Sequence, residues 1–288
     1  MVVALLIAGG AIAHAAWNLV AKRASLSGPA FVWLTSVGAA VVTAPLGIVL
    51  ALRDPPPPAA LLLAIAVSGL IHTGYFLALQ AGYRAGDVGV VYPLARGTGP
   101  LLSVIFAIVL FGERPGPLGL AGAGAIILGV VVIGLAGRTR GGGAARAGGS
   151  WGLLTGVAIA AYTLWDANAV QQWMLGPVLL SGGTMAVEAA LLSPLVLRSP
   201  ASRADVRAVL RRHRWDVVAV SVLSPLAYIL VLQALQLAPV SIVAPAREAS
   251  VVLVGLAGWL LFREPHPARR LAGAVVVLVG VALLAASR

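Results

Sequence analysis

The sequence predicts an all-α integral membrane protein, with ten transmembrane helices arranged as two inverted five-helix repeats. Three observations lead to this prediction: an apolar composition, continuous apolar segments long enough to cross a bilayer, and a duplicated pattern of residues. Hydrophobic residues make up 60% of the chain and charged residues only 10%, whereas soluble proteins average about 25% charged residues. This composition excludes an ordinary soluble globular domain.

Ten apolar segments have the length of membrane-spanning helices. A helical span needs about 20 residues, and continuous apolar runs of that length predict helices rather than the alternating strands of a β-barrel. The expected spans are residues 2–21, 29–51, 59–81, 88–111, 117–137, 151–172, 177–197, 215–237, 241–262 and 269–286. The glycine-rich residues 141–149 predict a flexible linker between an N-terminal repeat, 1–140, and a C-terminal repeat, 150–288, which together form one membrane domain.

The second half of the chain repeats the first half at a nearly constant offset. The matching positions are Arg96 with Arg247, Glu113 with Glu264, residues 120–123 with 271–274, and residues 75–81 with 228–234. An odd number of spans in each half means that the second half enters the membrane from the opposite side. The pattern therefore predicts an inverted repeat, the architecture that lets a transporter open alternately to each side around a midplane site.

The distribution of basic residues predicts the orientation in the membrane. The formal net charge is +11, and because nearly all of it lies in loops we do not expect nucleic-acid binding. The loops after the odd-numbered spans carry Lys22, Arg23, Arg84, Arg138, Arg140, Arg146, Arg198, Arg203, Arg207, Arg211, Arg212, Arg214, Arg263, Arg269 and Arg270. The other side carries Arg53, Arg114 and Arg288. The positive-inside rule then places the odd loops in the cytoplasm and both termini outside the cell membrane.

Several motifs resemble one known family over essentially the whole chain. They are residues 13–18 (AHAAWN), Pro93 after a short hairpin, and the closures 111–113 (FGE) and 262–264 (FRE). Together with the five-plus-five plan, they resemble the EamA-like branch of the drug/metabolite transporter superfamily. The resemblance implies a secondary transporter of small organic solutes, whose central cavity is lined by spans 1, 3, 4, 6, 8 and 9. Such members export amino acids, drugs or other metabolites, usually with cytoplasmic termini, and here we follow the loop charges instead.

Five ionisable residues lie well inside expected spans: Arg96, Asp166, Glu188, Arg247 and Glu248. Such residues cost about 2.5–3.5 kcal/mol on insertion scales and persist where they face protein or water. Arg96 and Arg247 are expected to bind an anionic group of the substrate, since a guanidinium pairs with a carboxylate through two hydrogen bonds. The alternative is that carboxylates of the bundle neutralise them. Glu248 points about 100° away from Arg247 on a continuous helix, so we expect it to pair only with other spans.

Aromatic and polar residues are expected to line the cavity beside these charges. Two triplets at spacing i, i+3, i+4 each form one helix face: His14, Trp17 and Asn18, and Tyr162, Trp165 and Asp166. Tyr75 matches Tyr228 across the repeat, and Tyr92 precedes Arg96 by one helical turn. Pro93 and Pro100 flank Arg96 and predict a kink in that span. The alternative is that these aromatic residues are interfacial anchors or packing residues.

Asp166 is the best candidate for coupling transport to protons. A carboxyl group inside a helix bundle can bind and release a proton as the cavity changes sides. Glu188 could serve the same role or pair with an arginine, and Glu248 is a further candidate. A permanent hydrogen-bond partnership between Asp166 and Asn18 remains an equal alternative.

Two repeated features are expected to support the structure rather than the transport chemistry. Glu113 and Glu264 lie at span ends beside arginines and predict interfacial ion pairs or helix caps. Glycines recur every seven residues at Gly122 and Gly129, and at Gly273 and Gly280. Small residues at this spacing permit close helix approach, within the chain or in a homodimer.

Three function classes fit these observations. The first is a secondary carrier, an exporter, of a small solute such as an amino acid or another carboxylate-bearing metabolite. The second is a proton-coupled exporter of cationic drugs, and the third is a lipid-phosphate translocase or membrane scaffold. We expect no enzyme activity, no cofactor and no metal site, because the sequence contains no phosphate-binding loop, nucleophile motif or metal-ligand cluster. Expected partners are the small-molecule substrate, protons and membrane lipid.

Overall fold

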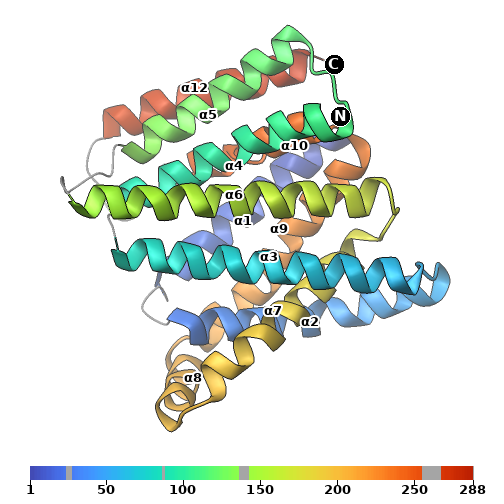
Figure 1. Cartoon of the computed structure of the whole chain (residues 1–288), viewed down its shortest axis with the longest axis vertical. Coiled ribbons are helices and arrows are strands. Elements are labelled where there is room, and N and C mark those ends of the chain that lie inside the picture. Colours follow the sequence, from blue (N-terminus) through green and yellow to red (C-terminus); the bar gives the residue numbers. More distant parts are fainter. Residues whose placement is uncertain (24–27, 86–87, 136–142, 255–266, 288) are drawn as a thin grey trace.

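The computed structural model describes residues 1–23, 28–85, 88–135, 143–254 and 267–287 (Figure 1). Every regular element in these ranges is a helix. The helices are α1 (Val2–Arg23), α2 (Gly28–Arg53), α3 (Pro58–Ala85), α4 (Val88–Phe111), α5 (Pro117–Leu135), α6 (Gly143–Gln171), α7 (Pro177–Leu197), α8 (Pro200–Arg212), α9 (Arg214–Leu237), α10 (Val240–Ala246) and α12 (Pro267–Ala286). The all-α prediction is thus confirmed for the described residues.

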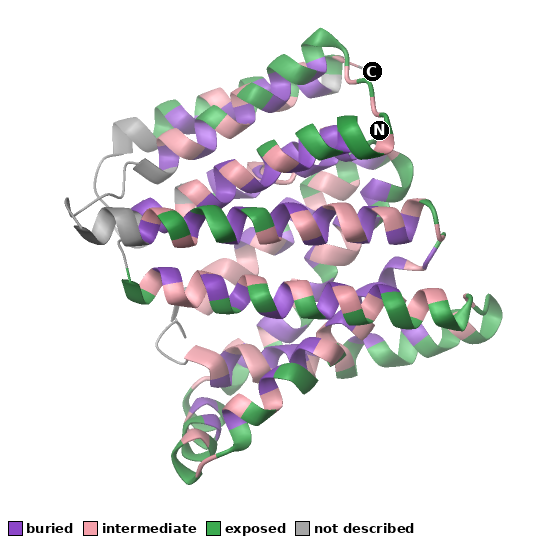
Figure 2. Ribbon diagram, in the orientation of Figure 1, coloured by how far each residue is buried: buried purple, intermediate pink, exposed green. Residues whose placement is uncertain are grey.

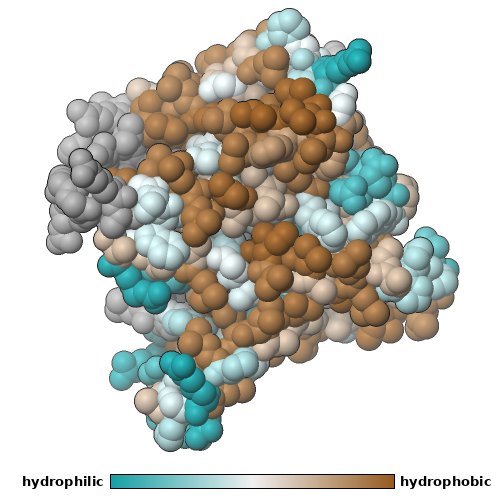
Figure 3. Space-filling model, in the orientation of Figure 1, coloured by the Kyte–Doolittle hydropathy of each residue, from teal (hydrophilic) through white to brown (hydrophobic). Residues whose placement is uncertain are grey.

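Seven of the described helices are long and apolar enough to cross a membrane: α1, α2, α3, α4, α6, α7 and α9. Two shorter apolar stretches, Pro117–Ile133 and Leu271–Leu284, lie in α5 and α12. The helices bury faces toward one another and expose aliphatic side chains outward, so apolar residues cover much of the surface (Figures 2 and 3). An apolar exterior is stable in lipid, where no water is needed to solvate it.

Helices from distant parts of the sequence pack side by side. α5 packs against α12, and α2 packs against α7. In the centre, α1 contacts α9, α3 contacts α6, and α6 also contacts α4. Figure 1 shows α5 and α12 together at one edge of the bundle and α2 and α7 at the other.

Two segments expected to be loops or linkers are helical. Residues 198–216 contain α8, whose N-cap Ser199 accepts a hydrogen bond from Ser202 N at 3.0 Å and whose first residue is a proline. Both features start helices, because the cap satisfies a free N–H group and proline has none to satisfy. α6 begins at Gly143, inside the glycine-rich stretch. Between the glycines of this stretch, residues 144–147 (AARA) are strong helix formers.

The ninth expected span is interrupted at residues 247–248. α10 ends at Ala246, Arg247 and Glu248 form a turn, and the helix resumes over residues 249–254. Glu248 N donates to Pro245 O at 2.9 Å, a tighter bond than the regular α-helical one. Pro245 lacks the N–H that would continue the ladder and so favours an interruption here. In span 4, where the sequence predicts a kink, the helix α4 runs unbroken from Val88 to Phe111, and a bend within it stays a prediction.

Glu113 caps α10 from the end of α4. Its carboxylate accepts hydrogen bonds from Val240 N at 2.7 Å and Ser241 N at 2.9 Å. The first N–H groups of a helix have no partner inside the helix, so a carboxylate there satisfies them and interacts favourably with the helix dipole. Of the two expected roles, Glu113 therefore has that of a cap. Its counterpart Glu264 lies outside the described residues.

The repeated glycines bring α5 and α12 into backbone contact. A methyl group on Gly122 would lie 2.8 Å from Gly280 O, and one on Gly129 would lie 2.7 Å from Gly273 O. Both distances are too short for a side chain, so the pairs Gly122–Gly280 and Gly129–Gly273 are needed for this packing. The glycine faces are thus occupied within the chain.

We expect Gly129→Ala to lower the free energy of unfolding by about 1–3 kcal/mol, because overpacking against backbone cannot be relieved by side-chain rotation. Gly124→Ala is the matched control: it lies on the same helix, and a methyl group there would meet nothing within 4 Å. Alanine favours helix over glycine, so the control should be neutral or stabilising. Thermal unfolding of the purified proteins in detergent measures the difference, and equal unfolding temperatures would contradict this packing.

Glu113→Ala should destabilise the protein by about 0.5–2 kcal/mol, the usual cost of removing a helix cap. The neighbouring Arg114 is exposed, so Arg114→Ala serves as the control and should change little. Chemical denaturation in detergent is a suitable measurement. An Arg114→Ala effect as large as that of Glu113→Ala would argue against the cap.

Candidate functional site

Polar and charged side chains from three segments meet in the interior of the bundle. Arg96 comes from the middle of α4, His14 from α1, and Arg247 and Glu248 from the turn after α10. Arg96 Nη1 lies 3.5 Å from Glu248 Oε2, and Arg96 Nη2 lies 3.2 Å from His14 Nε2. Arg247 Nε lies 3.4 Å from Glu248 Oε1. We call these four residues the arginine cluster.

Glu248 contacts both arginines, and this corrects the expectation that it pairs only with other spans. That expectation assumes a continuous helix, on which neighbouring side chains point about 100° apart. The helix is not continuous at residues 247–248, where the chain forms a turn. The Glu248 carboxylate therefore reaches its neighbour Arg247 as well as Arg96. Arg96 thus has a carboxylate partner within the bundle, and its contact with a substrate stays a prediction.

The arginine cluster holds more guanidinium than carboxylate groups. Two guanidiniums share one carboxylate, and Arg96 and Glu248 are only 9% and 1% exposed. Arg247 Nε and Nη2 are buried and make no hydrogen bond to any described residue, since the approach of Nε to Glu248 lacks hydrogen-bond geometry. Buried donors without a partner are costly. The cluster is therefore suited to receive a further anionic group.

Four rings from α3, α6 and α9 pack beside the arginine cluster. His72 stacks on Tyr162 with 4.2 Å between the ring centroids, and Tyr228 stands edge-on to His72 at 5.5 Å and to Tyr162 at 6.3 Å. Tyr75 stands edge-on to Tyr162 at 5.8 Å. We call these four residues the aromatic cluster. The Arg247 guanidinium carbon lies 5.6 Å from the Tyr162 ring centroid, so Arg247 joins the two clusters.

Asp166 is completely buried beside the aromatic cluster. The Tyr228 hydroxyl donates a hydrogen bond to Asp166 Oδ2, whereas Oδ1 is buried without a hydrogen-bond partner among the described residues. Ser68 lies nearby but outside hydrogen-bond geometry. Asn18, the expected alternative partner, donates instead to the His14 backbone carbonyl at 2.7 Å. One oxygen of Asp166 is therefore available to a proton or a cation.

His72 is the member of the aromatic cluster that sequence reasoning missed. Its Nδ1 lies 2.9 Å from the Ser68 carbonyl and 3.3 Å from the Ser68 hydroxyl, to which Thr184 donates at 3.1 Å. The repeat comparison could not identify it, because Pro225 occupies the matching position 153 residues later. Its spacing carried a signal, since His72 precedes Tyr75 by three residues and shares its helix face.

Tyr92 and Trp17 contact the arginine cluster from its margin. The Arg96 guanidinium carbon lies 5.5 Å from the Tyr92 ring centroid. Trp17 stands edge-on to His14 at 5.0 Å and also packs against the apolar core formed by α2, α7, α8 and α9. Tyr92 also packs against the apolar core that includes residues of α5 and α12, so both residues have a packing role as well as a contact with the cluster.

The other two sequence candidates, Trp165 and Glu188, have their contacts elsewhere. Trp165 donates to the Ala64 carbonyl at 3.1 Å and packs edge-on against Trp173 at 5.5 Å. Glu188 on α7 is 7% exposed and lies near Ser36 of α2, whose hydroxyl donates to the Val32 carbonyl of its own helix at 2.9 Å. No ion pair joins Glu188 to an arginine within the described part of the chain.

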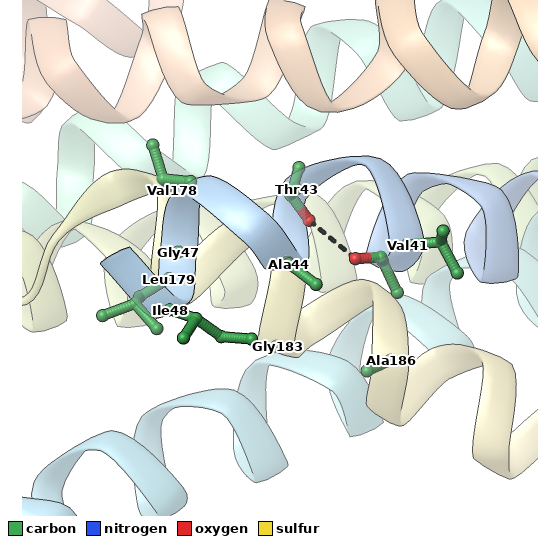
Figure 4. A pocket seen from close by; sticks show the side chains of 11 residues that line it. Val41, Thr43, Ala44, Gly47, Ile48, Val178, Leu179, Gly183 and Ala186 are labelled. Atoms are coloured by element: carbon green, nitrogen blue, oxygen red, sulfur yellow. Dashed lines mark hydrogen bonds between the residues drawn. The ribbon is translucent and has the colours of Figure 1, made fainter. Parts of the chain in front are cut away.

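A groove of about 390 Å³ lies between α2 and α7 (Figure 4). It is lined by small and aliphatic residues, among them Ala40, Gly47, Gly183 and Ala186. The one polar side chain, Thr43, donates to the Ala40 carbonyl of its own helix at 3.2 Å. The groove offers no charged group, so the chemistry of the site lies in the two polar clusters.

Known proteins resemble this chain in fold and in sequence. A solved crystal structure superposes with a TM-score of 0.71 and covers 97% of this chain and 98% of its own, at 17% sequence identity, which shows the fold alone. A protein named multidrug transporter PA4990, from Pseudomonas aeruginosa, is 41% identical over 75 residues. That match covers 25% of this chain and 68% of the relative.

The family profile adds a match along nearly the whole chain. The EamA-like transporter family matches residues 1–135 and again residues 146–286. These segments contain every residue of the arginine and aromatic clusters, and they contain the apolar helices of span length. The chain therefore belongs to the EamA-like transporter family and is a multi-pass membrane transporter.

Proposed function

We propose that this transporter is a secondary active carrier that exports a small carboxylate-bearing solute, such as an amino acid, by alternating access. The observation that carries the proposal is the excess of buried guanidinium groups in the arginine cluster. Arg247 keeps two buried donors without a hydrogen-bond partner among the described residues. A substrate carboxylate placed there would accept charge-assisted hydrogen bonds, which are stronger than neutral ones.

The proposed binding reaction exchanges one carboxylate for another. Glu248 holds Arg96 and Arg247 at 3.5 and 3.4 Å in the unliganded protein. A substrate carboxylate would pair with the Arg247 guanidinium, and Glu248 would then need to neutralise only Arg96. His14 and Tyr92 border the arginine side of this site, and Tyr75, Tyr162 and Tyr228 border the side of the substrate's carbon skeleton.

Alternating access requires two halves that move around the site, and we propose ten spans in inverted repeats over residues 1–140 and 150–288. The two matches to the family profile support this division. The packing also supports this division. α1 of the first half contacts α9 of the second, and their counterparts α6 and α3 contact each other in the same way. α2 with α7, and α5 with α12, are pairs of equivalent helices from the two halves. In this arrangement the arginine cluster lies at the interface of the halves, where substrate sites of such carriers are found.

We propose Asp166 as the residue that couples transport to protons. Its Oδ1 can take up a proton without breaking the contact between Oδ2 and Tyr228. Glu248 faces two guanidiniums and acts in this proposal as their counter-charge, and Glu188 is a second proton site beside α2. We further propose that the protein lies in the cell membrane with both termini outside, because the basic residues gather in the odd-numbered loops.

A second candidate function is proton-coupled export of cationic drugs. The relative from Pseudomonas aeruginosa is named a multidrug transporter, and the free oxygen of Asp166 beside three tyrosines could bind an organic cation. The two candidates differ in the residue that meets the substrate charge. Arg247 would do so for a carboxylate and Asp166 for a cation.

Arg247→Gln is expected to lower carboxylate transport into proteoliposomes by about 10- to 100-fold. The reason is that a hydrogen bond to a charged group contributes about 1.5–3 kcal/mol, which the variant loses. Arg53→Gln, at an exposed position, is the control and should keep wild-type transport. A thermal-shift screen with amino acids and organic acids identifies the substrate, because a bound ligand raises the unfolding temperature. A folded Arg247→Gln protein with full transport would contradict the carboxylate assignment.

Asp166→Asn is expected to leave substrate binding intact and to remove the dependence of transport on the pH gradient, since an amide cannot carry a proton. Asp54→Asn, at an exposed position, should retain that dependence. Transport at several internal and external pH values is the measurement. If Asp166→Asn instead abolishes binding of cations while carboxylates never bind, the second candidate function replaces the first.

A further inference from the structure

α8 lies outside the two polar clusters, between two helices of span length. It joins α7, which ends at Leu197, to α9, which begins at Arg214, and both of these helices are candidate spans. α8 itself is not among the candidate spans, and it therefore connects two of them. Figure 1 shows α8 at one extremity of the bundle, beside the ends of α7 and α9.

The two faces of α8 have different environments. Val206 and Val209 are buried in an apolar core with Ala30, Phe31 and residues of α9. Arg203, Arg207 and Arg211 follow one another at a spacing of four residues and are all exposed. Residues at this spacing share one helix face, so α8 presents a row of guanidiniums away from its buried side.

The positive charge around α8 is not neutralised by the protein. Residues 198–216 contain six arginines and only two aspartates. Asp216 lies 3.0 Å from His213 Nδ1 and Asp205 is exposed. Within the described residues no ion pair joins an arginine of α8 to a carboxylate, and Arg203 donates instead to the Leu197 carbonyl at 3.3 Å. These arginines remain available to an external anion.

Apolar side chains lie exposed beside these arginines. Trp215 is 72% exposed and Leu210 is 44% exposed. The Arg214 guanidinium carbon lies 5.6 Å from the Trp215 ring centroid. Figure 3 shows the hydrophilic surface of this corner next to hydrophobic surface. Tryptophan and arginine together are typical of the layer where lipid headgroups meet acyl chains, and this favours a lipid surface over a soluble acidic partner.

We propose that the exposed face of α8 is a binding surface for the phosphate headgroups of anionic phospholipids in the adjacent leaflet. The row of arginines supplies charge complementarity, since each guanidinium can donate two hydrogen bonds to a phosphate. Trp215 and Leu210 enter the acyl boundary beside the headgroups. Because α8 packs against α2, α7 and α9, bound anionic lipid stabilises this corner of the transporter.

A lipid titration of the purified full-length protein in detergent tests the proposal. Phosphatidylglycerol is added as the anionic probe and phosphatidylcholine as the zwitterionic reference, and the unfolding temperature is followed. Phosphatidylglycerol should raise it in a saturable manner, and phosphatidylcholine should not. Arg203→Gln combined with Arg207→Gln should raise the half-saturating concentration on the order of 20-fold, since each arginine near the surface contributes about a fivefold change in affinity.

Arg53→Gln combined with Arg114→Gln is the matched control, because both positions are exposed and lie away from α8. This control should keep the wild-type half-saturating concentration. An equal response of the wild-type protein to both lipids overturns the proposal, as does an unchanged titration of the α8 variant. If the double variant does not fold, the proposal is tested with Arg207→Gln alone and with the salt dependence of the wild-type titration. A response that high salt does not weaken overturns the proposal.

Discussion

The structure depends on burying two arginines with one carboxylate between them. A charged side chain at membrane depth costs about 2.5–3.5 kcal/mol on insertion scales unless protein groups or water surround it. Glu248 meets this requirement for Arg96 and Arg247 because the helix is interrupted where Glu248 leaves it. The short helix before the interruption is held at its start by Glu113. α4 therefore supports the cluster at two points, through Arg96 in its middle and Glu113 just beyond its end.

The surroundings of the arginine cluster differ between its two sides. On one side, α5 and α12 approach each other at glycines, and both helices contact α10. Backbone contact of this kind leaves little room for rearrangement, because no side chain can rotate away. On the other side, α3, α6 and α9 contribute the aromatic cluster and Asp166, whose Oδ1 has no hydrogen-bond partner among the described residues. The cluster therefore has a side packed backbone to backbone and a side that carries polar and aromatic side chains.

The sequence predicted individual helices well and their side-chain contacts only in part. α4 and α7 begin and end at the expected residues, because long apolar runs and, for α7, the proline at its first position are local signals. α8 was expected to be a loop, since a short basic helix lacks the apolar length of a span. The repeat pattern does not reveal the buried residue His72, because Pro225 occupies the matching position in the second half.

By itself, the sequence determined the all-helical membrane class, the positions of the seven described helices of span length, the family and the set of charged residues within the expected spans. These properties follow from composition, run length and repeated spacing, which are local. Only the tertiary structure decided how the charges are partnered: Glu248 between the two arginines, Tyr228 on Asp166, and Glu113 on α10. The physical reason is that each partnership joins segments far apart in the chain or depends on a helix interruption. Long-range contacts and helix interruptions leave no periodic pattern in the sequence.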